Sequence, residues 1–431
     1  MKVRFWIALV AQLVLFASLN FFTDWTLEWM PVYFVACAIL CGLAYLFAAT
    51  EFAAINKNTV WIFWLATIAL RLLGLSQAPG NEVWRFQADG VIQRAGFNPY
   101  QVAPNDPRVA GKIPQLARVP RNDEPTAFAA GAEVLFRVIP ATNNALLYKI
   151  IFGAADLLAI ALLLRLLDKQ TAVWLAWNPL VAYSFFGAAH FDSIILLAIV
   201  ALIFFLERFE QTAQPRWKFA LGAAVALGFA IALRPVCIVL LIPSLFALRR
   251  YFIALAAAIA LPVLLDCAFR FPFAQNLFGD FGHVSRLNDL FWWLIEDTIL
   301  PNWHQQYYRY DVILLIVSGL IGLLFMRNWR RGMLWSLGAS LILAPVLNAW
   351  YMTWILPVAT WRRAFAWHFL SVTIFAYYLF YNERLFALPW HAEPWLRGII
   401  VLPVLFAMIV MTTQRHQALN AANSTPPSSP V

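Results

Sequence analysis

Residues 77 to 143 hold the densest group of chemically useful side chains, and long apolar segments flank them on both sides. Seven basic residues lie there among six carboxylates, which are Glu82, Asp89, Asp106, Asp123, Glu124 and Glu133. A carboxylate can take the proton of an attacking hydroxyl while cations hold a departing anion. Asp89 is our candidate for such a general base, with Asp123 and Glu124 as rivals. The alternative is that Asp89-Gly90 only forms a turn.

Other polar residues of this stretch are expected to contact a substrate rather than to react with it. They lie in the run WRFQADGVIQRAGFNPY at 84–100 and in the later run VPRNDEPTAF at 119–128. The substrate contacts that we expect from the loop are Arg85, Arg94, Asn98, Tyr100, Asp123 and Glu124.

Two later stretches place ionisable side chains inside apolar sequence. His190 and Asp192 lie near the end of one apolar run, and Arg234 precedes Pro235 at the end of another. Ionisable groups at membrane depth are costly, so they are functional candidates by default. We expect His190 and Asp192 to contact substrate, unless they only satisfy each other at a helix junction. We expect Arg234 to meet a phosphate, unless it merely extends toward lipid headgroups.

The composition requires helices in a membrane to position these residues. Of the 431 residues, 62% are hydrophobic and 12% are charged, whereas soluble domains carry about 25% charged residues. A soluble enzyme is therefore excluded. The net charge of +9 is scattered rather than gathered in a stripe, so no nucleic-acid partner is expected. All four cysteines lie in apolar stretches, which predicts neither a disulfide framework nor a CxxC metal site.

The hydropathy pattern predicts an all-α, polytopic transmembrane bundle of about 12 to 14 spans. The expected spans are residues 4–22, 30–50, 58–76, 144–166, 171–188, 191–206, 217–234, 236–248, 251–268, 311–326, 333–348, 350–361, 364–381 and 398–413. Asp156 lies within a span, where an interhelical hydrogen bond is the expected role. Residues 1 to 419 form one membrane domain, and the Ser/Pro-rich tail 420 to 431 is expected to be disordered.

Basic residues predict the orientation of these spans. If the N-terminus is cytoplasmic, the inner loops collect most lysines and arginines, including the pairs Arg249-Arg250 and Arg362-Arg363. Such residues resist translocation in short loops. The loops at 77 to 143 and about 269 to 310 then lie outside and cap the expected active site. The predicted location is the cell (plasma or inner) membrane, with membrane lipid as a partner.

Four collinear pieces of the chain resemble the polytopic glycosyltransferases of the C superfamily. The pieces are DGVIQRAGFNPYQVAP with the later NDEPT, WNPLVAYSFFGAAHFDS at 177–193, AIALRPVCIVLLIP at 230–243, and AWYMTWILP at 349–357. The closest likeness is to family 87 and related bacterial mannosyltransferases that use a polyprenyl-phosphate sugar. The chain departs from their pattern at Ala127-Phe128, where Tyr-Pro-Pro is frequent, and at Ala189, where glycine commonly precedes the histidine.

The resemblance implies an inverting transfer of a hexose, with mannose as the first expectation. The donor would be a polyprenyl-phosphate sugar, and the acceptor a glycan, lipid or protein on the extracytoplasmic face. The resemblance favours Asp89 as the base, because Asp89 lies in the matched outer loop. Two other functions stay open: a transporter or flippase of lipid-linked sugars, and an outer-face ligase that moves a preassembled glycan.

No cofactor is predicted. Asp123 and Glu124 are adjacent rather than spaced as Asp-x-Asp, so a hard-cation site is not expected. The chain also contains neither a GxGxxG fingerprint nor a Walker loop.

Overall fold

A computed structural model describes residues 3–54, 59–212, 216–269, 286–299, 307–382 and 395–409. Within these residues the chain is helical, and its β-type contact is an isolated bridge between Leu287 and Val346. The all-α prediction is confirmed for this part of the chain. The predicted tail, and residues 270–285 and 300–306 of the predicted second outer loop, lie outside the described residues.

Helices follow one another with short connections, apart from one long polar insertion. The first three are α1 (Val3–Ser18), α2 (Met30–Ala53) and α3 (Val60–Leu75). Residues 77–143, which we call the cap, contain α4 (Glu82–Arg94) and α5 (Ala130–Val138). The middle of the chain forms α6 (Leu146–Leu163), α7 (Lys169–Ala176), α8 (Pro179–Ala182), the π-turn η4 (Tyr183–Gly187), α9 (Asp192–Gln211), α10 (Trp217–Leu233), the 3-10 helix η5 (Pro235–Leu240), α11 (Leu241–Leu248) and α12 (Phe252–Phe269).

The last third of the chain is built in the same way. Its elements are α13 (Tyr307–Leu324), α14 (Trp329–Ile342), the 3-10 helix η9 (Ala349–Trp354), α15 (Leu356–Arg362), α16 (Phe365–Thr373), the 3-10 helix η10 (Ile374–Tyr381) and a final helix over Trp395–Ile409.

Three described helices are long and apolar enough to cross a membrane: Val3–Phe22, Met30–Ala53 and Leu146–Leu163. The described residues also include shorter apolar helices of 10–17 residues, among them α3, α10 and the final helix. Many large apolar side chains on these helices are exposed, such as Leu65 on α3 and Phe406 on the final helix. Large exposed apolar areas are rare on proteins surrounded by water. These helices therefore indicate that the chain associates with a membrane.

Several predicted spans consist of short helical pieces instead of one continuous α-helix. Residues 171–188 divide into α7, α8 and η4, because Asn178 caps a new helix there and Pro179 occupies its first turn. The Asn178 side chain accepts hydrogen bonds from the N–H groups of Leu180 and Val181. Proline has no N–H to continue the preceding helix, so a break is expected at this point. Pro235 likewise begins η5, where the preceding α-helix ends.

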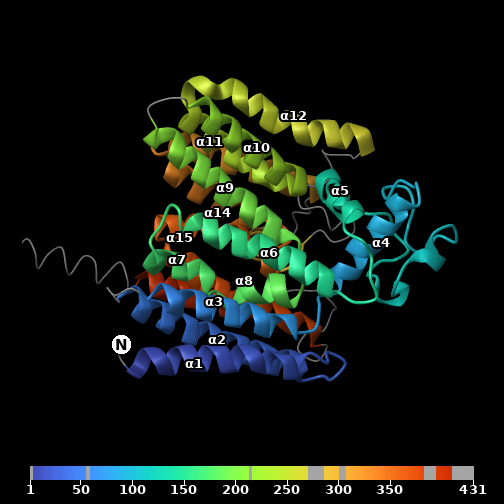
Figure 1. Cartoon of the computed structure of the whole chain (residues 1–431), viewed down its shortest axis with the longest axis horizontal. Coiled ribbons are helices and arrows are strands. Elements are labelled where there is room, and N and C mark those ends of the chain that lie inside the picture. Colours follow the sequence, from blue (N-terminus) through green and yellow to red (C-terminus); the bar gives the residue numbers. More distant parts are fainter. Residues whose placement is uncertain are drawn as a thin grey trace, which may run out of the picture.

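The helices gather their basic ends at the side away from the cap. Arg4 on α1 pairs with Glu51 near the end of α2 at 2.8 Å. Arg330 at the start of α14 pairs with Glu207 near the end of α9 at 2.6 Å. We call this side the distal end; the N-terminus lies there, whereas α4 and α5 stand at the opposite end of the molecule (Figure 1).

Buried polar contacts hold the helices in register between these two ends. Arg71 on α3 donates to Asp156 on α6 at 2.9 Å and also to the backbone carbonyl of Ala176 on α7. Both side chains are almost fully buried. The predicted interhelical role of Asp156 is confirmed, and the pair joins three helices.

Close helix contacts fix the cap on the bundle. A Cβ atom on Gly90 of α4 would lie 2.3 Å from the carbonyl oxygen of Phe136 on α5. A Cβ atom on Gly131 of α5 would lie 2.5 Å from the carbonyl oxygen of Ala232 on α10. Only glycine allows such approaches. The cap therefore packs directly against the end of α10 at Ala232, two positions before Arg234.

Candidate functional site

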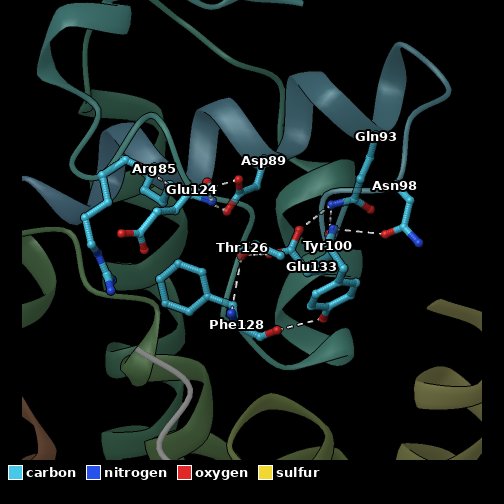
Figure 2. A network of polar contacts seen from close by, with 10 residues as sticks. Arg85, Asp89, Gln93, Asn98, Tyr100, Glu124, Thr126, Phe128 and Glu133 are labelled. Atoms are coloured by element: carbon cyan, nitrogen blue, oxygen red, sulfur yellow. Dashed lines mark hydrogen bonds and ion pairs between the residues drawn. The ribbon is translucent and has the colours of Figure 1, made fainter. Parts of the chain in front are cut away.

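Asp89, the base predicted from the sequence, lies inside the cap and faces Arg85. The Nε of Arg85 donates to both oxygens of Asp89, at 3.0 and 3.1 Å, across one turn of α4 (Figure 2). Asp89 is 0% exposed. The other Arg85 nitrogens donate to the backbone carbonyls of Arg121 and Glu124, at 2.8 and 2.9 Å. The pair therefore binds the loop 121–124 to α4.

Glu133 of α5 completes this network from the opposite side. Its oxygens accept hydrogen bonds from the Thr126 hydroxyl at 2.8 Å and the Gln93 amide at 2.7 Å (Figure 2). Burial and the neighbouring charge of Asp89 raise the pKa of Glu133 well above its usual value. Burial also raises the pKa of Asp89, against the opposing effect of Arg85. We assign the shared proton to Glu133, because Arg85 stabilises the charge of Asp89.

The other predicted loop residues mostly bind the cap to itself. Arg94 donates to the backbone carbonyls of Arg137 and Ile139 at the end of α5, both at 2.9 Å. The side-chain oxygen of Asn98 accepts from the N–H of Tyr100, whose hydroxyl donates to the carbonyl of Phe128 at 2.6 Å. The rival carboxylates lie nearer the surface: Asp123 is exposed and Glu124 is partly exposed. The cap is thus an ordered unit with a polar interior.

Replacing Asp89 by asparagine is expected to cost the cap about 3 kcal/mol, because it leaves the buried Arg85 cation without its carboxylate. Replacing Glu133 by glutamine is expected to cost about 1 kcal/mol or less, because a neutral amide replaces a protonated carboxyl group. Hydrogen exchange of the α4 and α5 amides measures both costs. Equal costs for the two variants would contradict the assignment of the charge to Asp89.

The same proton predicts a pH dependence. Since the pKa of Glu133 is higher in the folded cap than the ordinary 4.5, the folded cap binds this proton more tightly than the unfolded chain does. The stabilisation is complete below the ordinary pKa and is lost as the pH rises through the raised pKa. Amide protection of α5, corrected for intrinsic exchange, should fall in the wild type as the pH rises above the ordinary pKa and through the raised pKa of Glu133. In the Glu133→Gln variant this decline should be absent; a decline of equal size there would refute it.

A second polar group lies where the cap meets the bundle. Glu82, in the first turn of α4, lies 3.2 Å from Nδ1 of His190, the residue two positions before α9. The ring of His190 stacks on Trp350 of η9 with centroids 4.0 Å apart and planes 16° apart. His190 is buried, whereas the side chain of Glu82 is 22% exposed. The carboxylate therefore lies at the boundary between the buried group and the outside.

Asp192 and Arg234 extend this group inward. Asp192, at the start of α9, accepts a hydrogen bond from the Trp354 indole at 2.8 Å. The Nε of Arg234, directly after α10, lies 3.9 Å from the same carboxyl group, longer than a charge-assisted hydrogen bond. Four aromatic rings surround the guanidinium at 5.1 to 5.8 Å, from Phe128, Phe191, Tyr351 and Trp354. We call Glu82, His190, Asp192, Arg234, Trp350 and Trp354 the His190 cluster.

In this cluster, Oδ2 of Asp192 and Nε1 of Trp350 are buried without a hydrogen-bond partner among the described residues. Buried polar groups are nearly always paired, so each exception needs a reason. Both atoms lie on residues that directly contact the charged groups of the cluster. An acceptor and a donor are thus available for a polar ligand here.

The cluster joins segments that are distant in the sequence. Glu82 comes from the cap, His190 from the segment before α9, Asp192 from the first position of α9, Arg234 from the end of α10, and the tryptophans from η9. The sequence pointed to His190, Asp192 and Arg234 separately, and the structure brings these three together. Asp89 is not among the described residues that these three contact. The sequence does not indicate Glu82, Trp350 and Trp354 as site residues, because their partners are more than 100 residues away.

The described residues contain no group of three or more His, Cys, Asp or Glu side chains placed to hold a metal ion. The cluster combines a cation, a His-carboxylate pair and stacked aromatic rings. Such a set can hold an anion, take a proton and pack against a sugar ring.

Comparison with known proteins adds no relative, since no family model, curated protein or solved structure matches this chain. The function must therefore be inferred from the residues of the chain itself.

Proposed function

We propose that the chain is an integral membrane glycosyltransferase. It moves a hexose, with mannose as the first candidate, from a polyprenyl phosphate to a glycan, lipid or protein acceptor on the extracytoplasmic face. The observation that carries the proposal is the convergence of the His190 cluster. Residues from three of the four segments that resemble the C-superfamily enzymes, 177–193, 230–243 and 349–357, meet there around a buried arginine, and Phe128 of the cap packs against it.

Arg234 takes the phosphate in this proposal. In the reaction, the acceptor oxygen forms a bond to the anomeric carbon while the bond from that carbon to the phosphate oxygen breaks. The polyprenyl phosphate leaves with the electron pair, and a guanidinium can hold it through two parallel hydrogen bonds. Because Arg234 is 1% exposed, donor binding must displace a covering side chain. Phe128 is the candidate that we choose, since it is the ring that the cap contributes, with its centroid 5.8 Å from the guanidinium.

Two carboxylates compete for the acceptor proton. Asp89 would have to open its pair with Arg85 before it could act. Glu82 is partly exposed and needs no such opening. Its contact with His190 holds it in the same cluster as Arg234. We therefore assign the proton to Glu82 and a positioning role to Asp89 and Arg85. Asp89 as the base is the alternative.

A donor assay with the purified chain in bilayers tests the reaction type. Labelled polyprenyl-phosphate mannose should give a new glycosidic product and an equal amount of polyprenyl phosphate. Label that crosses the bilayer while the donor stays intact would instead support a flippase. Transfer of a whole preassembled glycan from another donor would support a ligase.

A further inference from the structure

A cavity of about 650 Å³ opens at the distal end, and none of its lining residues belongs to the His190 cluster. It lies between the end of α2, the start of α7, the end of α15 and the start of α16. Trp174 and Phe365 form an apolar wall, and Asp168, Thr171 and Arg363 provide polar groups. Its volume is in the range that holds a small organic ligand.

The position of this cavity relative to the membrane follows from α2. Helix α2 is one of the three helices long enough to cross a bilayer, and its last residues, Ala53 and Ala54, line the cavity. The end of a spanning helix lies at the level of the lipid headgroups. Trp174 on the cavity wall is the residue type that prefers this level. A lipid that occupies the cavity would thus have its headgroup inside and its acyl chains in the bilayer.

The charges of the cavity are of both signs and lie on its exposed side. Arg363 and Asp168 approach to 3.9 Å, with side chains 76% and 55% exposed. Such an exposed pair is weak, because water screens it on both sides. Arg363 also reaches the Thr171 hydroxyl at 3.3 Å. A ligand that carries an anion and a cation could therefore replace the pair at little cost.

The inner wall of the cavity is polar but satisfied. One ring nitrogen of His368 contacts the Tyr45 hydroxyl and the other contacts the Thr360 hydroxyl, both at 3.3 Å. These contacts occupy both nitrogens of a neutral imidazole. The charges that can select a ligand are then those of Arg363 and Asp168.

We propose that this cavity binds the phosphate-and-ammonium headgroup of a zwitterionic phospholipid such as phosphatidylethanolamine. Arg363 and the Thr171 hydroxyl hold the phosphate, and Asp168 holds the ammonium group next to Trp174. The lipid would join α2, α7, α15 and α16 at the distal end. This site is independent of the proposed sugar transfer.

Binding of phosphatidylethanolamine and phosphatidylglycerol to the full chain in detergent, measured by native mass spectrometry, tests the proposal. The wild type should prefer phosphatidylethanolamine. Asp168 also caps α7, where its side chain accepts a hydrogen bond from the N–H of Thr171 at 2.7 Å. Asp168→Asn should remove the preference while keeping this cap, because asparagine also caps helices. Arg363→Asn should weaken both lipids about tenfold, and asparagine tolerates the left-handed backbone found at this position (φ 54°). An unchanged preference in Asp168→Asn, or unchanged binding of both lipids in Arg363→Asn, would overturn the site.

Two controls make the result specific. Arg362→Gln removes a neighbouring charge that does not line the cavity, so it should bind both lipids as the wild type does. An equal loss in this variant would show a general charge effect and contradict the site. Soluble glycerophosphoethanolamine at the same concentration should not displace the lipid. Displacement would assign the cavity to a free phosphate-and-amine compound and contradict the lipid assignment.

Discussion

Arg234→Gln is expected to lower sugar transfer by at least about 10²- to 10³-fold, since it removes the cation that would hold the departing phosphate. The loss should fall mainly on kcat, because the phosphate gains charge as its bond to the sugar breaks. Arg234→Lys should recover part of the rate, as lysine keeps the charge but not the planar fork. The rate is measured with labelled polyprenyl-phosphate mannose.

A folding control is needed because Arg234 packs among four aromatic rings. Hydrogen exchange of α9 and α10 should match the wild type in the lysine variant. A glutamine variant that transfers at the wild-type rate would remove Arg234 from the mechanism.

Glu82→Gln is expected to lower transfer about 10²- to 10⁴-fold, the range for loss of a general base. The amide keeps the size of the side chain and can still contact His190, but it cannot take a proton. Asp106→Asn serves as a matched control, because Asp106 is a carboxylate of the same cap whose partner is the surface residue Arg108. It should transfer at the wild-type rate.

Asp89→Asn separates the two candidate bases. If Asp89 only positions the cap, its activity loss should follow the loss of amide protection in α4 and α5. An Asp89→Asn variant with an intact cap and no activity, beside an active Glu82→Gln variant, would return the base to Asp89.

Local patterns predicted much of this molecule. Apolar segments and scattered arginines indicated a helical membrane protein, and the helical fold is confirmed where the structure describes the chain. The ion pair of Arg85 with Asp89 could also be predicted, because residues at i and i+4 share one face of a helix. The Asp89-Gly90 pair suggested a turn instead. In the structure, Gly90 allows α5 to approach α4 closely.

Long-range contacts could not be predicted in this way. The contact of Glu82 with His190 spans 108 residues, and that of Asp192 with Trp354 spans 162. Nothing in the neighbourhood of either residue indicates its partner. The sequence could place His190 and Asp192 near a helix junction, but only the packing of α4 and η9 against that junction selects their contacts.

A structure of the chain with bound polyprenyl phosphate would test the central claim most directly. We expect the phosphorus atom to lie within roughly 4 Å of the Arg234 guanidinium, the distance of a charge-assisted contact. We also expect Phe128 to be displaced from its present position. A phosphate held instead by Arg85, or by Arg363 at the distal end, with the His190 cluster unchanged, would contradict it.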